Sequence, residues 1–171
     1  LFRSRPRARA GEALYELAVR QAREPAFYTR MGVEDRIDAR FELYTLHVLL
    51  LVMRLRDEGG RGTEAAQELF DTYVSALDHA LRELGVGDIS VGKKMRKLGE
   101  AMYGRMTAYE PALRAADADE LAAGLARNVF DSDDPAAGRA LAAYAVDSRA
   151  RLAGQSFEAV STDPEWAEIK P

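Results

Sequence analysis

The stretch that decides the fold is EDRIDARFELYTLHVLLLVMRLRDE, residues 34–58. Its large apolar side chains recur at alternating spacings of four and three residues, which is the period of an α-helix. From Leu43 to Met53 the stretch is apolar almost all round, so we expect other helices to surround it. This run of 11 residues is shorter than the roughly 20 that a bilayer span needs, and Arg54 ends it. We therefore predict a buried central helix.

The rest of the chain shows the same helical period between the Pro, Gly and Asp residues that interrupt it. Period-two alternation, which is typical of half-buried strands, is missing from the sequence. Further helices are predicted at residues 12–24, 63–84, 117–130 and 134–152, with a basic helix between residues 88 and 111. The sequence thus predicts an all-α fold, a compact single-domain bundle of about six helices around the long apolar central helix.

The chain divides into three parts by composition. Residues 1–10 contain arginines and no acid and are predicted to be a flexible basic arm. Residues 11–153 are predicted to form the helical domain, and residues 154–171 an irregular acidic tail. The 171 residues include no cysteine, which excludes disulfides, a thiol nucleophile and thiolate metal sites.

The net charge of −4 is distributed unevenly along the chain. Residues 115–171 contain 5 Lys and Arg against 11 Asp and Glu, a balance of −6, which leaves +2 for residues 1–114. We therefore expect an anionic partner to approach the first two-thirds of the chain.

Residues 82–105, RELGVGDISVGKKMRKLGEAMYGR, combine a glycine turn with a cationic helix. Residues 87–93 match the start of a P-loop, but Lys94 stands where a P-loop needs a hydroxyl for Mg²⁺. A P-loop also follows a strand, whereas a helix is predicted here, so we interpret the stretch as a helix–turn–helix corner. Gly85 is expected to end the first helix, and Asp88 or Ser90 to cap the second. The cations of the second helix are Lys93, Lys94, Arg96, Lys97 and Arg105. Their pattern alone leaves two interpretations open, an anion-binding face and a merely solvated one.

The sequence contains no recognisable catalytic motif or metal-binding pattern. His47 lies in the most apolar helix and has no carboxylate or second imidazole three or four residues away. A buried, hydrogen-bonded structural histidine is therefore favoured over a ligand. The alternative is a helical protein that binds a quinone, a lipid or haem around His47. His79 is predicted to be a surface residue. We expect no enzyme and no cofactor, but a protein that works by binding.

Several blocks of this sequence have the pattern of a known family. They are QAREPAFY at 21–28 with Gly32 and Val33, DRIDARFE at 35–42 continuing to LHV at 46–48, LRE at 81–83 with GVGD at 85–88, Lys93, YGR at 103–105 and LARN at 125–128. The chain resembles the ubiquinol–cytochrome c chaperone family, assembly factors for cytochrome b of respiratory complex III. Two departures are Gly92, where the family often has proline, and Ala39, where it often has glycine. We expect both to alter loop geometry more than function.

The resemblance implies a non-enzymatic chaperone that binds newly synthesised cytochrome b and supports assembly of ubiquinol–cytochrome c reductase. The composition is similar to that of a bacterial member, acting in the cytoplasm at the inner membrane; mitochondrial members act on the matrix side, with a small partner protein. The apolar client is expected in a groove where the second apolar face of the long helix meets Val86. The basic helix is expected to meet the ribosome or an anionic membrane surface.

The residues expected to contact partners come from these two surfaces. They are Arg40, His47, Arg82, Val86, Asp88, Lys93, Lys94, Lys97, Tyr103 and Arg105. Arg82, Asp88 and Arg105 are also expected to lock the glycine turn, with the lysines facing outward.

Overall fold

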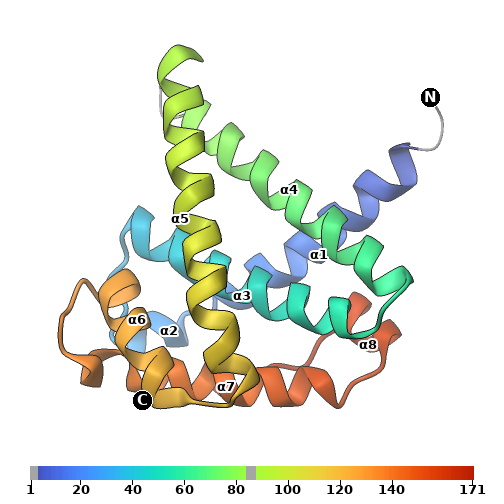
Figure 1. Cartoon of the computed structure of the whole chain (residues 1–171). Coiled ribbons are helices and arrows are strands. Elements are labelled where there is room, and N and C mark those ends of the chain that lie inside the picture. Colours follow the sequence, from blue (N-terminus) through green and yellow to red (C-terminus); the bar gives the residue numbers. More distant parts are fainter. Residues whose placement is uncertain (1–3, 84–87) are drawn as a thin grey trace.

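A computed structural model describes residues 4–83 and 88–171, and within them every regular element is a helix (Figure 1). The elements are α1 (Ser4–Ala22), α2 (Ala26–Thr29), α3 (Ile37–Asp57), α4 (Arg61–Glu83), α5 (Asp88–Arg114), α6 (Ala118–Phe130), the 3-10 helix η1 (Pro135–Gly138), α7 (Arg139–Ala153) and α8 (Phe157–Thr162). The predicted all-α bundle is confirmed. Among the described helices, none is long and apolar enough to cross a membrane.

Helix α3 is the centre of the bundle, as its apolar sequence predicts. All its side chains from Leu43 to Leu55 are buried, and the helix contacts α1, α4, α5, α6 and α7. Each fully buried leucine contributes roughly 1.5–3 kcal/mol through removal of its apolar surface from water. This helix therefore supplies more of the core than any other described helix.

The two ends of the molecule are built from segments of different charge. In Figure 1, the end of α4 and the N-terminal half of α5 meet at the upper end, and the Arg-rich start of α1 also points upward. Helices α6 and α7 and the C-terminus lie at the lower end. The acidic final third of the chain is thus placed opposite the basic segments.

Asp residues set the predicted helix starts in the second half of the chain. The Asp117 carboxylate accepts a hydrogen bond from the backbone N–H of Glu120, which is the capping geometry expected for α6. The Asp134 carboxylate accepts one from the backbone N–H of Ala136, but the turn that follows is the 3-10 helix η1. Helix α7 begins only after this turn.

The N-terminal segment differs from its prediction. Residues 4–10, predicted as part of a flexible arm, are helical and continuous with α1. Gly11 does not end the helix, because it lies where α1 crosses α4. A Cβ atom at this position would come within 2.6 Å of the Glu68 carbonyl oxygen, so glycine is required by the close approach of the two backbones.

The C-terminal segment also differs, because the predicted irregular tail contains α8 and packs against the core. The Ser156 hydroxyl caps α8 by accepting a hydrogen bond from the backbone N–H of Ala159. Beyond α8, Ala167 and Ile169 are buried. The backbone N–H of Ala167 donates to the Ser148 hydroxyl on α7, which fixes the segment without any helical period of its own.

Helix α5 is longer than predicted at its C-terminus. It continues through Pro111 to Arg114, so this proline lies in the last turn of the helix instead of ending it. At the other end α5 begins at Asp88. The proposed end of α4 at Gly85, and Val86, lie outside the described residues.

Candidate partner-binding site

An open groove lies between α1, α3 and α4, with a volume of about 410 Å³. Its apolar lining comes from all three helices and consists of Tyr15, Ile37, Phe41, Tyr44, Ala76 and Ala80. Helix α3 contributes residues from its first two turns, where the exposed start of the helix meets its buried run. The small Ala76 and Ala80, one turn apart on α4, leave the space that makes the groove.

The floor of the groove is held in place by contacts among its own residues. The Tyr44 ring packs edge-on against Phe41, with 6.1 Å between ring centroids. The Arg23 Nε–H donates a hydrogen bond of 2.9 Å to the Tyr44 hydroxyl oxygen. Ile37 remains 53% exposed, which is unusual for a large aliphatic side chain. The groove therefore offers a preformed apolar surface to a partner.

Charged groups border this apolar floor. Arg40 is exposed and bonded to the Asp35 carboxylate at 2.6 Å, and His79 lies 3.0 Å from the Glu83 carboxylate on the α4 side. A second hollow of about 470 Å³ adjoins the groove and shares Arg23, Arg40 and Tyr44 with it. The two arginines thus stand between two neighbouring hollows on one surface.

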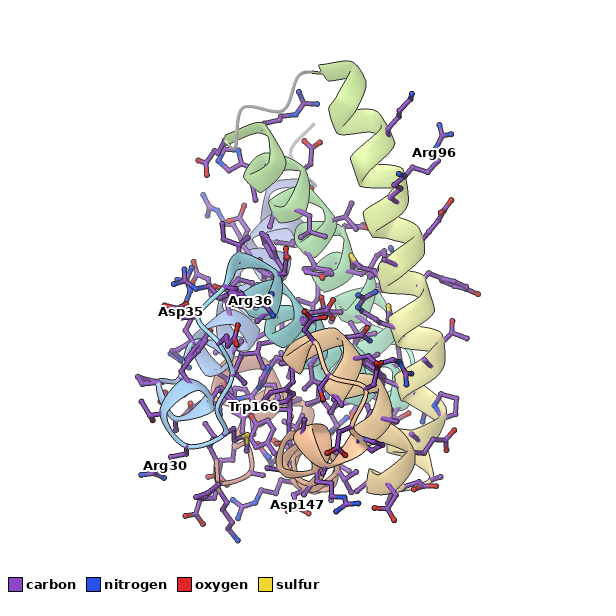
Figure 2. All side chains as sticks on the ribbon, turned by 90° about the vertical axis from the view of Figure 1, so that its left-hand side faces the viewer. Arg30, Asp35, Arg36, Arg96, Asp147 and Trp166 are labelled. Atoms are coloured by element: carbon purple, nitrogen blue, oxygen red, sulfur yellow. The ribbon has the colours of Figure 1, made fainter. Side chains whose placement is uncertain are left out.

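The predicted basic face is present on α5. The side chains of Lys93, Arg96, Lys97 and Tyr103 are exposed, and Tyr103 is 75% exposed. Figure 2 shows Arg96 pointing from α5 away from the rest of the molecule. The side chain of Lys94 lies outside the described residues.

Arg105 has a different position from the one predicted. Its guanidinium forms a two-pronged ion pair with Glu42 of α3, with 2.7 Å between Nε and Oε2 and 2.6 Å between Nη2 and Oε1. Burial raises the pKa of Glu42, and the bond from Arg105 opposes this rise. Arg105 therefore joins α5 to the central helix and does not lock the glycine turn. Arg82 bonds to Asp78 within α4 at 3.1 Å.

His47 is also placed away from any binding surface, because its side chain is fully buried. The Nδ1 atom lies 2.7 Å from the Leu43 carbonyl oxygen, and Nε2 lies 2.9 Å from the Tyr144 hydroxyl. The carbonyl requires a proton on Nδ1, so Nε2 accepts from the hydroxyl. Burial lowers the pKa of His47 to about 4. The prediction that His47 contacts a partner is therefore wrong. The other interpretation, a buried and hydrogen-bonded structural histidine, is the one that the structure shows.

The sequence did not point to most residues of the groove. Tyr15, Arg23, Ile37 and Ala76 come from three helices, and no motif connects them. Two signals were nevertheless available: the exposed start of the long apolar helix, and the alanines spaced four residues apart in the next helix. Only the packing of three helices shows that these signals meet.

The comparisons with known proteins agree with this architecture. The family model described as ubiquinol-cytochrome C chaperone matches residues 29–166. The crystal structure of the Cbp3 homolog from Brucella abortus is similar, with a TM-score of 0.84, 37% sequence identity, and coverage of 99% of this chain and 96% of that one. The ubiquinol-cytochrome-c reductase complex assembly factor 1 of Xenopus laevis is 23% identical over 124 residues, which are 71% of this chain and 62% of that protein.

The matched region contains α3, the groove residues of α4 and the whole of α5. The family match extends over well more than half of the chain, and the similar crystal structure covers almost all of it. The chain belongs to the ubiquinol–cytochrome c chaperone family.

Proposed function

We propose that this protein is a non-enzymatic chaperone that binds newly synthesised cytochrome b and holds it for assembly into ubiquinol–cytochrome c reductase. The observation that carries the proposal is the open apolar groove between α1, α3 and α4, with two arginines at its border. The names of the Xenopus laevis relative and of the family support the assembly role. Recognition of cytochrome b as the client is the further step that we infer.

The groove suits one face of an apolar helix. The volume of the groove lies within the range of roughly 300–1,000 Å³ that is usual for small-ligand pockets. The groove is therefore large enough for several side chains of a client helix, while the helix itself would lie at the surface. Side chains one turn apart on a client helix would pack on Ile37 and Phe41. Arg23 and Arg40 are placed to donate to the free carbonyl oxygens at the end of such a helix.

We infer that the protein works beside the inner membrane, on its cytoplasmic side, where an apolar client is made and inserted. A small partner protein is compatible with this role. The alternative of a quinone, lipid or haem site around His47 has lost the observation that motivated it, because the ring is fully buried and both of its nitrogens are already hydrogen-bonded inside the core.

The test is deletion of the gene followed by a haem spectrum of the membranes. We expect loss of the cytochrome b signal and of assembled complex III, and recovery of both when the wild-type chain is supplied. Normal cytochrome b and complex III in the deletion strain would contradict the proposed function.

A matched pair of variants tests the groove itself. Ala80→Glu places a charge in the groove lining on α4, and Ala143→Glu makes the same change on the exposed surface of α7. We expect the second chain to restore complex III and the first to fail, with equal helical circular dichroism. Equal recovery by both chains would show that the groove is not the client site.

A further inference from the structure

The outer face of α5 consists of side chains that the rest of the protein does not use. At spacings of three and four residues, it exposes Lys93, Arg96, Lys97, Glu100, Tyr103 and Thr107. Lys93, Arg96 and Lys97 make no ion pair or hydrogen bond with any described residue, whereas the nearby Arg105 is bound to Glu42. Glu100 is the single acid among these exposed side chains, so the face is net positive and can attract an anionic partner.

This face also presents an exposed aromatic ring beside an accessible stretch of backbone. Tyr103 is 75% exposed, and the next residue is Gly104. A Cβ atom at Gly104 would meet nothing within 4 Å, so no packing inside the protein requires glycine here. A glycine inside an exposed helix is less favourable than an alanine. The backbone of α5 is thus left open to an outside surface beside an exposed aromatic ring.

The distribution of charge over the whole molecule favours the N-terminal half of this face. The N-terminal half of α5 and the Arg-rich start of α1 lie at the upper end in Figure 1. The lower end holds α6, α7 and the C-terminus, within the segment 115–171 whose charge balance is −6. A protein with this charge distribution turns its upper end toward an anionic surface.

We propose that the outer face of α5 docks on the head groups of an anionic phospholipid bilayer. Three cations and a tyrosine match such a surface, since basic residues attract anionic lipids and tyrosine rings prefer the head-group level. RNA is less well matched, because RNA-binding domains are strongly basic and this chain has a net charge of −4. This proposal rests on the proposed function in one respect, the identity of the membrane. Docking on the inner membrane would hold the client groove beside it.

The experiment is flotation of the full chain with vesicles. We expect binding to phosphatidylcholine vesicles that contain about one-third phosphatidylglycerol, and little binding to pure phosphatidylcholine. Binding should be lost when salt is raised from about 0.05 M to about 0.5 M, because salt screens exposed charges.

Charge-neutralised variants locate the docking face. Each cation near an anionic bilayer contributes roughly fivefold to binding, so K93Q/R96Q/K97Q should bind on the order of a hundredfold more weakly. The matched control R127Q/R139Q/K170Q removes three exposed cations from α6, α7 and the C-terminal segment, changes the net charge equally, and should bind like wild type. Tyr103→Ser should weaken binding severalfold at low salt.

Three outcomes would overturn the proposal. They are equal binding to both kinds of vesicle, equal losses in the two triple variants, and tighter binding to an RNA oligonucleotide than to the anionic vesicles at the same salt. These outcomes are independent of the deletion test. A chain that restores complex III without binding vesicles would refute the docking face and leave the proposed function standing.

Discussion

The buried His47 makes the stability of this protein depend on pH in a way that the structure predicts. Burial lowers the pKa of His47 from 6.5 to about 4 in the folded chain. As the pH falls, His47 in the unfolded chain therefore binds a proton near pH 6.5, whereas His47 in the folded chain binds it only near pH 4. The stability that the neutral ring provides is complete above pH 6.5 and is lost as the pH falls toward 4.

The magnitude follows from the two pKa values. Each pKa unit corresponds to about 1.4 kcal/mol, so the fall from 6.5 to about 4 removes about 3 kcal/mol from the free energy of unfolding. About 2 kcal/mol of this is already lost near pH 5. This is a large fraction of the 5–15 kcal/mol or so that stabilises a typical domain.

The assay is urea unfolding followed by helical circular dichroism near pH 7 and near pH 5. The variant His47→Gln should be less stable than wild type near pH 7, because it disturbs the bonds to Leu43 and Tyr144. Its stability should nevertheless fall about 2 kcal/mol less between the two pH values, since the titrating group is gone. His79→Gln is the matched control, because it makes the same exchange at a histidine that is exposed on α4. A His47→Gln chain with the wild-type slope would refute the reasoning.

Three further predictions use the same urea assay. Arg105→Ala leaves the half-buried Glu42 carboxylate unpaired and should cost about 1–3 kcal/mol, with a smaller loss in the Glu42→Ala, Arg105→Ala double variant; a larger loss in the double variant would contradict this. Arg54→Met should cost about 2–4 kcal/mol, because the buried guanidinium donates to the carbonyl oxygens of residues 152 and 155, and a wild-type midpoint would disprove it. Asp117→Ala should cost about 0.5–2 kcal/mol through loss of the α6 cap, and Asp119→Ala serves as a control without that bond.

The parts of the fold that could be predicted are those specified by neighbours along the chain. The residues from Leu43 to Met53 predict a buried helix because their apolar side chains cover almost the whole circumference of the helix, whereas a helix at the surface needs only one apolar face. The pattern of Asp117 and Glu120 predicts the start of α6 because the cap is formed within four residues. Both features are confirmed, since distant segments do not change the local geometry.

The parts that could not be predicted depend on distant contacts. Ile169 has no helical or strand pattern around it, yet it is buried, and its carbonyl oxygen accepts a bond from Arg30, 139 residues earlier. Arg105 belongs to a cationic helix by sequence, but its partner Glu42 is 63 residues away. A pattern on one helix does not show which of its charges another helix neutralises.

The groove combines both situations. The apolar nature of Phe41 and Tyr44 is evident from the sequence, and so is the small size of Ala76 and Ala80. That α4 leaves the start of α3 uncovered follows only from how three helices cross. The predicted position near Val86 lies outside the described residues, so this part of the expectation stays a prediction.

The central helix has a consequence for the order in which this chain is made and folded. His47 completes its hydrogen bonds with Tyr144, and Arg54 with the backbone of residues 152 and 155, each about one hundred residues later in the chain. During synthesis, α3 therefore leaves the ribosome long before the segments that cover it. Until α7 and the C-terminal segment emerge, the chain exposes an apolar helix of its own. A protein proposed to shelter the apolar helices of a client thus passes through the same vulnerable state first.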